Sequence, residues 1–242
     1  MPNFYITKDM ISGSKACITG EEAHHISRVL RMKKGDAVTL CDGEGTFYES
    51  VLTDFSQDGV TAEIKNSRIA ETEPKVKITL YQAIPKSPKL EMIVQKLTEL
   101  GVTRIVPMNT ARIVAKLDKE NKIERLRKIV IEAAKQSKRG IIPKVESPVD
   151  FGKAAADAAK AELSLIPYEE ETQNSLRSEV SESTAKTLSI MIGPEGGFEK
   201  SEIELAKSLG IIPVTLGKRI LRTETAGIAV VSAALCMLGE ME

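Results

Sequence analysis

The sequence has few of the residues that build metal sites and disulfide frameworks. Its 242 residues include only 2 histidines, 3 cysteines and no tryptophan. The cysteines, Cys17, Cys41 and Cys236, are far apart and form no C-x-x-C pair, which argues against a disulfide framework and against a zinc site. The histidines, His24 and His25, are adjacent, so their side chains diverge too much to share one ion. We therefore expect no metal, and a reducing, cytoplasmic location.

Long hydrophobic runs are absent as well. No stretch approaches the roughly 18 consecutive apolar residues that a membrane-spanning helix needs. Residues 1–10 show no basic stretch followed by an apolar run, so no signal peptide is expected. Hydrophobic residues make up 42% and charged residues 28% of the chain, an ordinary composition for a folded protein. This composition predicts one or two globular domains with no membrane partner.

The formal net charge is zero, but the charge is unevenly distributed. Residues 86–140 contain 14 basic and 6 acidic residues, a net charge of +8. Clustered Lys and Arg favour contact with a polyanion such as nucleic acid. Two solvated helix faces would give the same pattern, so charge alone leaves both interpretations open.

The first 70 residues have a β-rich pattern. Alternating apolar and polar residues predict strands at 37–41, 46–53 and 59–64, separated by Asp-Gly turns. A short helix is expected at 20–29. This part should form a small β-barrel or sandwich, and the polar segment 67–75 reads as a linker after it.

From residue 76 onward strands and helices alternate. Strands are expected at 77–84, 104–110, 163–169, 188–194 and 212–217. One helix is expected to begin at a cap formed by Ser87 with Pro88 and to end at Gly101. A second is expected at 122–138, after a capping box formed by Asn121 and Glu124. Further helices are expected at about 150–161, 200–209 and 224–239. The alternation predicts a mostly parallel sheet with helices on both faces.

A glycine-rich segment follows the predicted strand at 188–194. It reads Ile192-Gly193-Pro194-Glu195-Gly196-Gly197 and leads into a helix. Ligands bind beyond the carboxyl ends of strands in open α/β sheets, and glycine lets the backbone approach a flat ligand closely. The segment matches neither a Walker loop nor a dinucleotide fingerprint. A plain strand-to-helix turn remains an equal alternative.

A second segment follows the strand at 212–217. It runs from Leu216 to Ala226 as LGKRILRTETA, with Arg222, Glu224 and Thr225 crowded at the start of an apolar helix. A threonine N-cap, at 223 or 225, with Glu224 serving the helix dipole would explain these residues structurally. It would not explain Arg222, because a cation is disfavoured at a helix N-terminus. A third strand end, at 167–169, is placed to close on the same ligand, or is simply an exposed loop.

Several segments together resemble a known family. They are HHISRVLRMKKGD, QAIPKSPKLEMIVQKLTELGVTRIVP, EAAKQSKRG, IGPEGGFEKSEIELAK and LGKRILRTETAGIAVVSAAL. They resemble the 16S rRNA uridine N3-methyltransferase family of the SPOUT superfamily over essentially the whole chain. The resemblance implies a PUA-like β-barrel RNA-binding domain at 1–72 and a SPOUT α/β domain with a trefoil knot at 73–242. It further implies S-adenosyl-L-methionine as cofactor, 16S rRNA of the small ribosomal subunit as partner, and a homodimer.

The resemblance also assigns expected roles to particular residues. Expected at the cofactor are Pro167, Ile192, Gly193, Pro194, Glu195, Gly196, Gly197, Leu216, Gly217, Ile220, Leu221, Thr225 and Ala226. Expected at the RNA are Arg28, Arg31, Lys33, Lys34, Gln136 and Arg139. Uracil N3 is hardly ionised at neutral pH, so the reaction needs a base or a group that stabilises the anion. Arg222 is the candidate for anion stabilisation and Glu224 the candidate base.

Two alternative functions remain open. One is a non-catalytic RNA-binding assembly factor, against which the intact cofactor motifs argue. The other is a SPOUT methyltransferase that acts on another RNA, such as tRNA, or on a ribose hydroxyl. For the two histidines, structural or RNA-contact roles are favoured over catalysis.

Overall fold

A computed structural model describes residues 2–86, 89–113 and 120–241. The chain divides into two compact units. The first comprises Met1–Glu73 and Ala134–Ile142, and the second Pro74–Ala133 and Pro143–Glu242. A division at residues 72 and 73 places residues 134–142 in the second domain, whereas in the structure they belong to the first unit.

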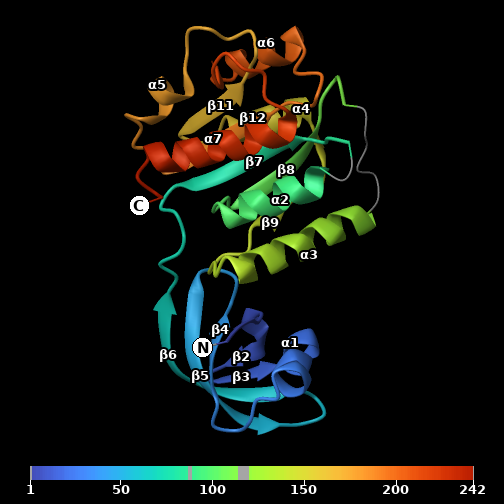
Figure 1. The fold of residues 1–242 in the computed structure, drawn as a ribbon, viewed down its shortest axis with the longest axis vertical. Coiled ribbons are helices and arrows are strands. Elements are labelled where there is room, and N and C mark those ends of the chain that lie inside the picture. Colours follow the sequence, from blue (N-terminus) through green and yellow to red (C-terminus); the bar gives the residue numbers. More distant parts are fainter. Residues whose placement is uncertain (1, 87–88, 114–119, 242) are drawn as a thin grey trace. The chain divides into compact units, whose positions relative to one another are not determined.

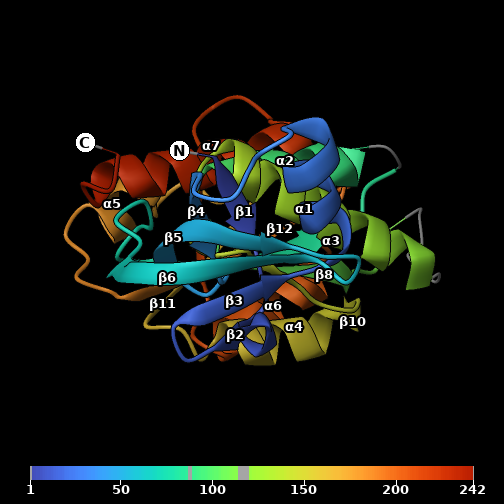
Figure 2. The ribbon, with the colours of Figure 1, turned by 90° about the horizontal axis from the view of Figure 1, so that it is seen from below.

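The first unit is built on a six-stranded sheet with the order β1-β4-β5-β6-β3-β2. Its elements are β1 (Asn3–Tyr5), the 3₁₀ turn η1 (Lys8–Met10), β2 (Ile11–Ser12), β3 (Lys15–Ile18), α1 (Gly20–His24), the π-helical turn η2 (His25–Val29), β4 (Ala37–Cys41), β5 (Thr46–Phe55) and β6 (Val60–Ile69). β1 pairs with β4 in parallel and the other neighbours are antiparallel. Figure 2 shows β5, β6 and β3 side by side.

The predicted β-rich pattern of this unit is confirmed. The strand at 37–41 has the expected bounds, while β5 and β6 are longer than expected. Two register shifts, at Glu49/Ser50 and at Leu52/Asp54, interrupt the β5–β6 pairing. Such irregularities bend a strand, which lets a sheet curve around a core. The helix expected at 20–29 is present, with its second half widened into η2.

The linker expected at 67–75 begins later than predicted. Residues 67–69 are the end of β6, where Ile69 pairs with Thr46. At residues 67–69 the polar composition therefore reflects exposed side chains at the end of a strand rather than a loop.

The second unit is built on a parallel sheet with the order β10-β8-β7-β12-β11-β13, and β9 also pairs with β8. The strands are β7 (Lys77–Ala83), β8 (Arg104–Asn109), β9 (Lys144–Val145), β10 (Val149–Asp150), β11 (Leu163–Pro167), β12 (Thr187–Ile192) and β13 (Ile212–Val214). The helices are α2 (Lys89–Glu99), α3 (Glu120–Gln136), α4 (Phe151–Ala158), α5 (Leu176–Val180), α6 (Lys200–Ser208) and α7 (Thr223–Met237). All strand pairs in this sheet are parallel.

Helices cover both faces of this sheet, as predicted. Tyr81 and Met191 point to one face, where they pack in a core cluster with residues of α4 and α6. α2 and α7 contact each other, and Figure 1 shows them on the opposite face. Successive strand residues point to opposite faces, so Gln82 next to Tyr81 faces α7 and bonds to its first residue. That alternation places the polar side chain of Gln82 next to the start of α7.

The helix boundaries predicted for this unit agree with the structure only in part. The capping box at Asn121 is wrong, because Asn121 lies inside α3 rather than before it. The proposed cap at Ser87 and Pro88 lies outside the described residues. Gly101 does follow the end of α2, with a left-handed φ of 104° that favours glycine. No helix in the described parts of the chain is long and apolar enough to cross a membrane.

Candidate functional site

Both sequence motifs leave the same edge of the parallel sheet. The first follows β12 and the second follows β13, and β11 lies between these two strands. Parallel strands end together, so the loops after β12, β11 and β13 share one edge, which is where open α/β sheets bind ligands. β7 flanks β12 on its other side, with Gln82 in register with Ile192.

A hydrogen-bonded chain centred on Thr223 joins the two motifs. Gln82 Nε2 donates to Thr223 Oγ1 at 2.9 Å, and Thr223 Oγ1 donates to the carbonyl oxygen of Gly193 at 2.6 Å. Gln82 and Thr223 are both buried. The idea that Thr223 or Thr225 is the N-cap of the last helix is therefore wrong. Arg222 occupies the N-cap position, and the Thr223 side chain connects the loops.

Lys89 forms a second connection between the motifs. Its Nζ lies 3.3 Å from Glu195 Oε1 and 3.2 Å from Glu224 Oε2. The carboxylate of Glu224 accepts a hydrogen bond from the backbone N–H of the same residue. This bond and the nearby ammonium of Lys89 hold the pKa of Glu224 below its ordinary value. Partial burial raises the pKa of Glu195. Hydrogen bonds from backbone N–H groups and from Lys89 outweigh this effect, so the pKa of that carboxyl is lowered as well. Both carboxylates are thus ionised at neutral pH.

Lys89 is a site residue that sequence reasoning missed. It begins α2, within the segment QAIPKSPKLE, where a lysine looks like any solvated helix residue. The signal that could have found it is its position: α2 follows β7, whose carboxyl end lies beside that of β12.

The glycine-rich segment is held tightly by its neighbours. Gly197 has a left-handed φ of 68°, and its N–H donates to the carbonyl of Pro194 at 3.0 Å. A Cβ at Gly197 would collide with the carboxylate of Glu169, so the third strand end does reach this loop. Arg112, which follows β8, donates from Nη1 to the carbonyl of Gly196 at 2.9 Å. Arg112 was also not expected from the sequence.

The second loop is more open. Gly217 has a φ of 98°, and a Cβ there would have no neighbour within 4 Å. Leu216 and Leu221 are half-buried, whereas Ile220 is 89% exposed. An apolar side chain this exposed beside an unobstructed backbone is suited to covering a flat, largely apolar ligand.

Arg222 is exposed beside this loop. In the part of the chain that the structure describes, no carboxylate forms an ion pair with it, and its side chain makes no capping bond. Glu224, two residues further on, forms an ion pair with Lys89. The guanidinium is therefore available to a ligand. Thr225 is exposed and Ala226 is half-buried on the same turn of α7.

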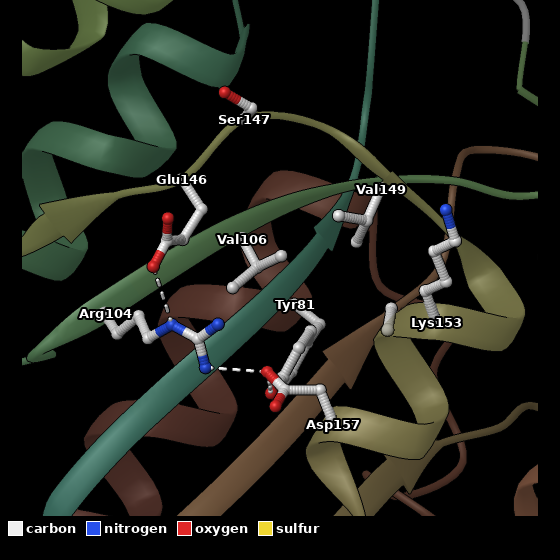
Figure 3. Close-up of a pocket in the computed structure, with 9 residues that line it drawn as sticks. Tyr81, Arg104, Val106, Glu146, Ser147, Val149, Lys153 and Asp157 are labelled. Carbon is white, nitrogen blue, oxygen red and sulfur yellow. Dashed lines mark hydrogen bonds and ion pairs between the residues drawn. The ribbon is translucent and has the colours of Figure 1, made fainter.

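A cavity of about 330 Å³ lies elsewhere in this unit, against α4 (Figure 3). Arg104 donates to Glu146 at 3.2 Å and to Asp157 at 2.8 Å, and the Tyr81 hydroxyl donates to Asp157 at 2.8 Å. None of the expected site residues lines this cavity. These bonds fasten α4 to β7 and β8, so we regard the cavity as a by-product of a structural charge network.

The expected RNA contacts all fall in the first unit, in different environments. Arg28, Arg31, Lys33, Lys34 and Gln136 are exposed. Arg139 is only 2% exposed, and its Nη2 lies 2.6 Å from Glu73 Oε2. The expectation that Arg139 contacts RNA is therefore wrong.

Arg139 instead helps to attach residues 134–142 to the rest of the first unit. The Glu73 carboxylate also accepts bonds from the backbone N–H groups of Gly140 at 2.8 Å and Ile141 at 3.1 Å. A Cβ at Gly140 would collide with Ala70, so the close approach requires glycine. This carboxylate, whose side chain is only 10% exposed, holds the segment in place.

Within the described ranges, no group of three or more His, Cys, Asp or Glu side chains is arranged to hold a metal ion. The site therefore consists of backbone, apolar side chains, three carboxylates and the cations Lys89, Arg112 and Arg222.

Fold and site together define a class of protein: a PUA-like unit combined with an α/β domain that has loops for a ligand at its strand ends. Residues 72–235 match the model of an RNA methyltransferase domain, and residues 18–65 match the PUA domain of RNA methyltransferases. The chain belongs to this RNA methyltransferase family.

Relatives of known name support the assignment. The chain is 36% identical to ribosomal RNA small subunit methyltransferase E of Bacillus subtilis, over 94% of this chain and 93% of that protein. Its fold matches the enzyme of the same name from Neisseria gonorrhoeae, solved with S-adenosyl methionine, with a TM-score of 0.85, 30% identity and 98% coverage of both chains. A Legionella pneumophila protein solved with the same cofactor matches with a TM-score of 0.82 and 32% identity, covering 97% of this chain and 96% of that one.

Proposed function

We propose that this protein transfers a methyl group from S-adenosylmethionine to N3 of a uridine in the 16S rRNA of the small ribosomal subunit. The observation that carries the proposal is the joining of the two motif loops by Thr223 at the carboxyl edge of the sheet. The named relatives act on small-subunit rRNA, and two related structures hold this cofactor. The choice of uridine N3 rests on the resemblance of the motifs.

The residues present fit the cofactor. Gln82 Oε1 is buried and has no hydrogen-bond partner among the described residues, and the glycines of both loops leave backbone groups within reach of a ligand. Leu216, Ile220 and Leu221 would cover the adenine, and the backbone at 193–197 and 217 would bond to its edge. Pro167, Thr225 and Ala226 would complete the walls. The carboxylates at this edge suit a ligand with positive charge.

When bound, the cofactor supplies a methyl carbon on a sulfonium, so the transfer is a direct displacement that depends mainly on alignment. The protein's part is to orient the uridine and to stabilise the charge that develops when N3 loses its proton. Arg222 does this by donating to the uracil oxygens that share the negative charge. An exposed guanidinium that forms no ion pair with any described residue is suited to that role.

Glu224 has a different role from the one first expected. A general base works best with a pKa near the operating pH. The pKa of Glu224 is lowered instead, by its own backbone N–H and by Lys89. We therefore assign Glu224 to positioning: it holds Lys89, and through Lys89 the Glu195 loop.

The first unit would hold the RNA. Arg28, Arg31, Lys33 and Lys34 contact phosphates, and Gln136 contacts the RNA from the end of α3.

We propose the domains 1–72 and 73–242 as functional divisions, and a trefoil knot in the second. α7 is apolar on nearly all sides, and Ala229 and Ala233 on it remain half-buried in this chain. That surface suits a closely packed homodimer.

The test is methyl transfer from labelled cofactor to small ribosomal subunits, bare 16S rRNA and tRNA in parallel. The proposal predicts label in 16S rRNA, free or assembled, and none in tRNA. Label in tRNA would favour a methyltransferase with another RNA substrate. Cofactor binding by calorimetry without transfer to any RNA would favour an assembly factor.

A further inference from the structure

Two apolar side chains protrude from the first unit at the end of η2. Val29 is 60% exposed and Leu30 is 44% exposed. The same helical segment already buries Ala23 and Ile26 in the core of the unit, so the core does not need this pair. We call Val29 and Leu30 the apolar tip. Single exposed apolar residues are common, but two neighbours at one turn form a contact surface.

The backbone holds the apolar tip in one conformation. The N–H of Leu30 donates to the carbonyl of His25 at 2.9 Å, and the N–H of Met32 donates to that of Ile26 at 3.0 Å. Arg31, between them, has a φ of 51°. A left-handed conformation is unfavourable for a residue with a side chain and persists only where its surroundings impose it. π-helical turns are also frequent at functional sites.

The segment after the tip is fixed as well. Asp36 accepts a bond from the N–H of Lys33 at 2.7 Å, and its carbonyl accepts one from Leu52 of β5 at 2.9 Å. The tip therefore does not need to be ordered when a partner binds, which lowers the entropic cost of binding.

Cations flank the tip in the sequence. Arg28 precedes it, and Arg31, Lys33 and Lys34 follow it within four residues. All four are exposed, and in the described parts of the chain none of them forms an ion pair with a carboxylate. A rigid apolar pair flanked by four uncompensated positive charges matches a partner that has both apolar faces and regular negative charge.

We propose that the apolar tip contacts the faces of unpaired bases in rRNA, while the flanking cations hold the phosphates on either side. This inference rests on the proposed function and extends it to a base-contacting element. Valine and leucine cannot bond to phosphate, so their only favourable contact on RNA is with bases or sugars. Base faces are covered in a duplex and accessible in loops and bulges. Apolar side chains inserted beside bases are a known mode of nucleic-acid binding. An apolar protein partner would leave the four charges uncompensated.

The test measures binding to a 16S rRNA hairpin with an unpaired loop, and to a fully paired duplex of equal length, at several salt concentrations. The variants are Val29→Ser/Leu30→Ser, Arg28→Gln, and the control Ile69→Ser, which changes an apolar residue of the same unit that is 79% exposed. The tip variant should bind the hairpin about tenfold more weakly at every salt concentration, because apolar burial is lost without loss of charge. Arg28→Gln should flatten the slope of log K against log salt by about 0.7.

The outcomes separate the inference from its alternatives. Tip variants that match wild type on the hairpin, or weaken hairpin and duplex binding equally, would overturn it. A tip variant that changes only the sedimentation coefficient would show that the tip binds a second copy instead. A wild-type protein that binds neither RNA would overturn the proposed function as well, whereas strong wild-type binding with an indifferent tip would overturn this inference alone.

Discussion

The ammonium of Lys89 lies 3.2 Å from a carboxylate oxygen of Glu224 and 3.3 Å from one of Glu195. These carboxylates belong to loops that follow two different strands, so one cation at the start of α2 holds both. Together with the hydrogen bond from the backbone N–H of Glu224, this cation lowers the pKa of the Glu224 carboxyl.

The first prediction concerns this cation. Lys89→Met should remove the positive charge that lowers the pKa of Glu224, so that Glu224 gains its proton at a higher pH than before. The acidic limb of the transfer rate should then move to higher pH, and cofactor binding should weaken by about tenfold, the size of one charged hydrogen bond. Lys89→Arg should restore both. Lys96→Met, on the same helix, is the control. An unchanged pH profile would contradict the positioning role.

The second prediction tests the chain through Thr223. Thr223→Val keeps the shape but leaves Gln82 Nε2 with one acceptor fewer and the Gly193 carbonyl without its donor. We expect a loss of stability of about 1–3 kcal/mol, because buried polar groups lose partners. Cofactor affinity should fall with it. Urea denaturation and calorimetry measure the two effects, and Thr225→Val, at an exposed position, should change neither stability nor fold. A stable Thr223→Val protein with normal affinity would show that the link is dispensable.

The third prediction separates structural from RNA-contacting arginines. Arg139→Ala should destabilise the protein by about 3 kcal/mol, because it leaves the Glu73 carboxylate, whose side chain is only 10% exposed, without its charged partner. Arg28→Ala should leave stability within about 0.5 kcal/mol of wild type, as exposed substitutions do. Its effect should appear in the salt dependence of RNA binding. If Arg139→Ala were stable and flattened the salt slope, the structural assignment would be wrong.

The fourth prediction uses the charge network of Figure 3. Burial would raise the pKa of Asp157, but hydrogen bonds from Arg104 and Tyr81 outweigh it and lower the pKa from 3.8 to about 2. A carboxyl group whose pKa is lower in the folded than in the unfolded protein stabilises the fold at pH values above its unfolded pKa. That contribution is lost as the pH falls through about 2. The side chain is one-third exposed, so the contribution should be only about 1 kcal/mol. Urea midpoints between pH 5 and pH 2 should fall less for Asp157→Asn than for wild type, and Asp54→Asn should behave as wild type.

The fifth prediction concerns catalysis. Arg222→Ala should lower the single-turnover transfer rate by roughly 10²–10³, the usual cost of losing one donor to a developing anion. Cofactor affinity and melting temperature should change little, because Arg222 is exposed and has no ion pair in the described parts of the chain. Arg219→Ala, in the same exposed loop, is the control. Parallel losses of stability and cofactor binding would mean that Arg222 holds the loop rather than the substrate.

The strand ends could be predicted because their signals are local. Alternation between two Asp-Gly turns defines β5, and an apolar run followed by glycines defines β12 and its loop. The contacts within the site are not local. Lys89 lies more than 100 residues before both of its carboxylates, and neighbouring positions in the sheet follow from topology rather than from spacing.

Arg139 shows the same limit for a structural residue. It follows a helix in a strongly basic block, where exposure is the natural expectation. Its partner Glu73 lies 66 residues earlier, in a segment polar enough to read as a linker. Only the return of residues 134–142 to the first unit buries the pair, and nothing in either segment alone indicates that return.

The most direct test of the account is the identity of the methylated atom. Small-subunit rRNA is incubated with the protein and labelled cofactor, digested to nucleosides, and analysed by chromatography and mass spectrometry against standards. We expect a single labelled product, 3-methyluridine, at no more than one per 16S rRNA, and a strong reduction with Arg222→Ala. Label on a ribose 2′-oxygen, on another base, or on no nucleoside at all would contradict it.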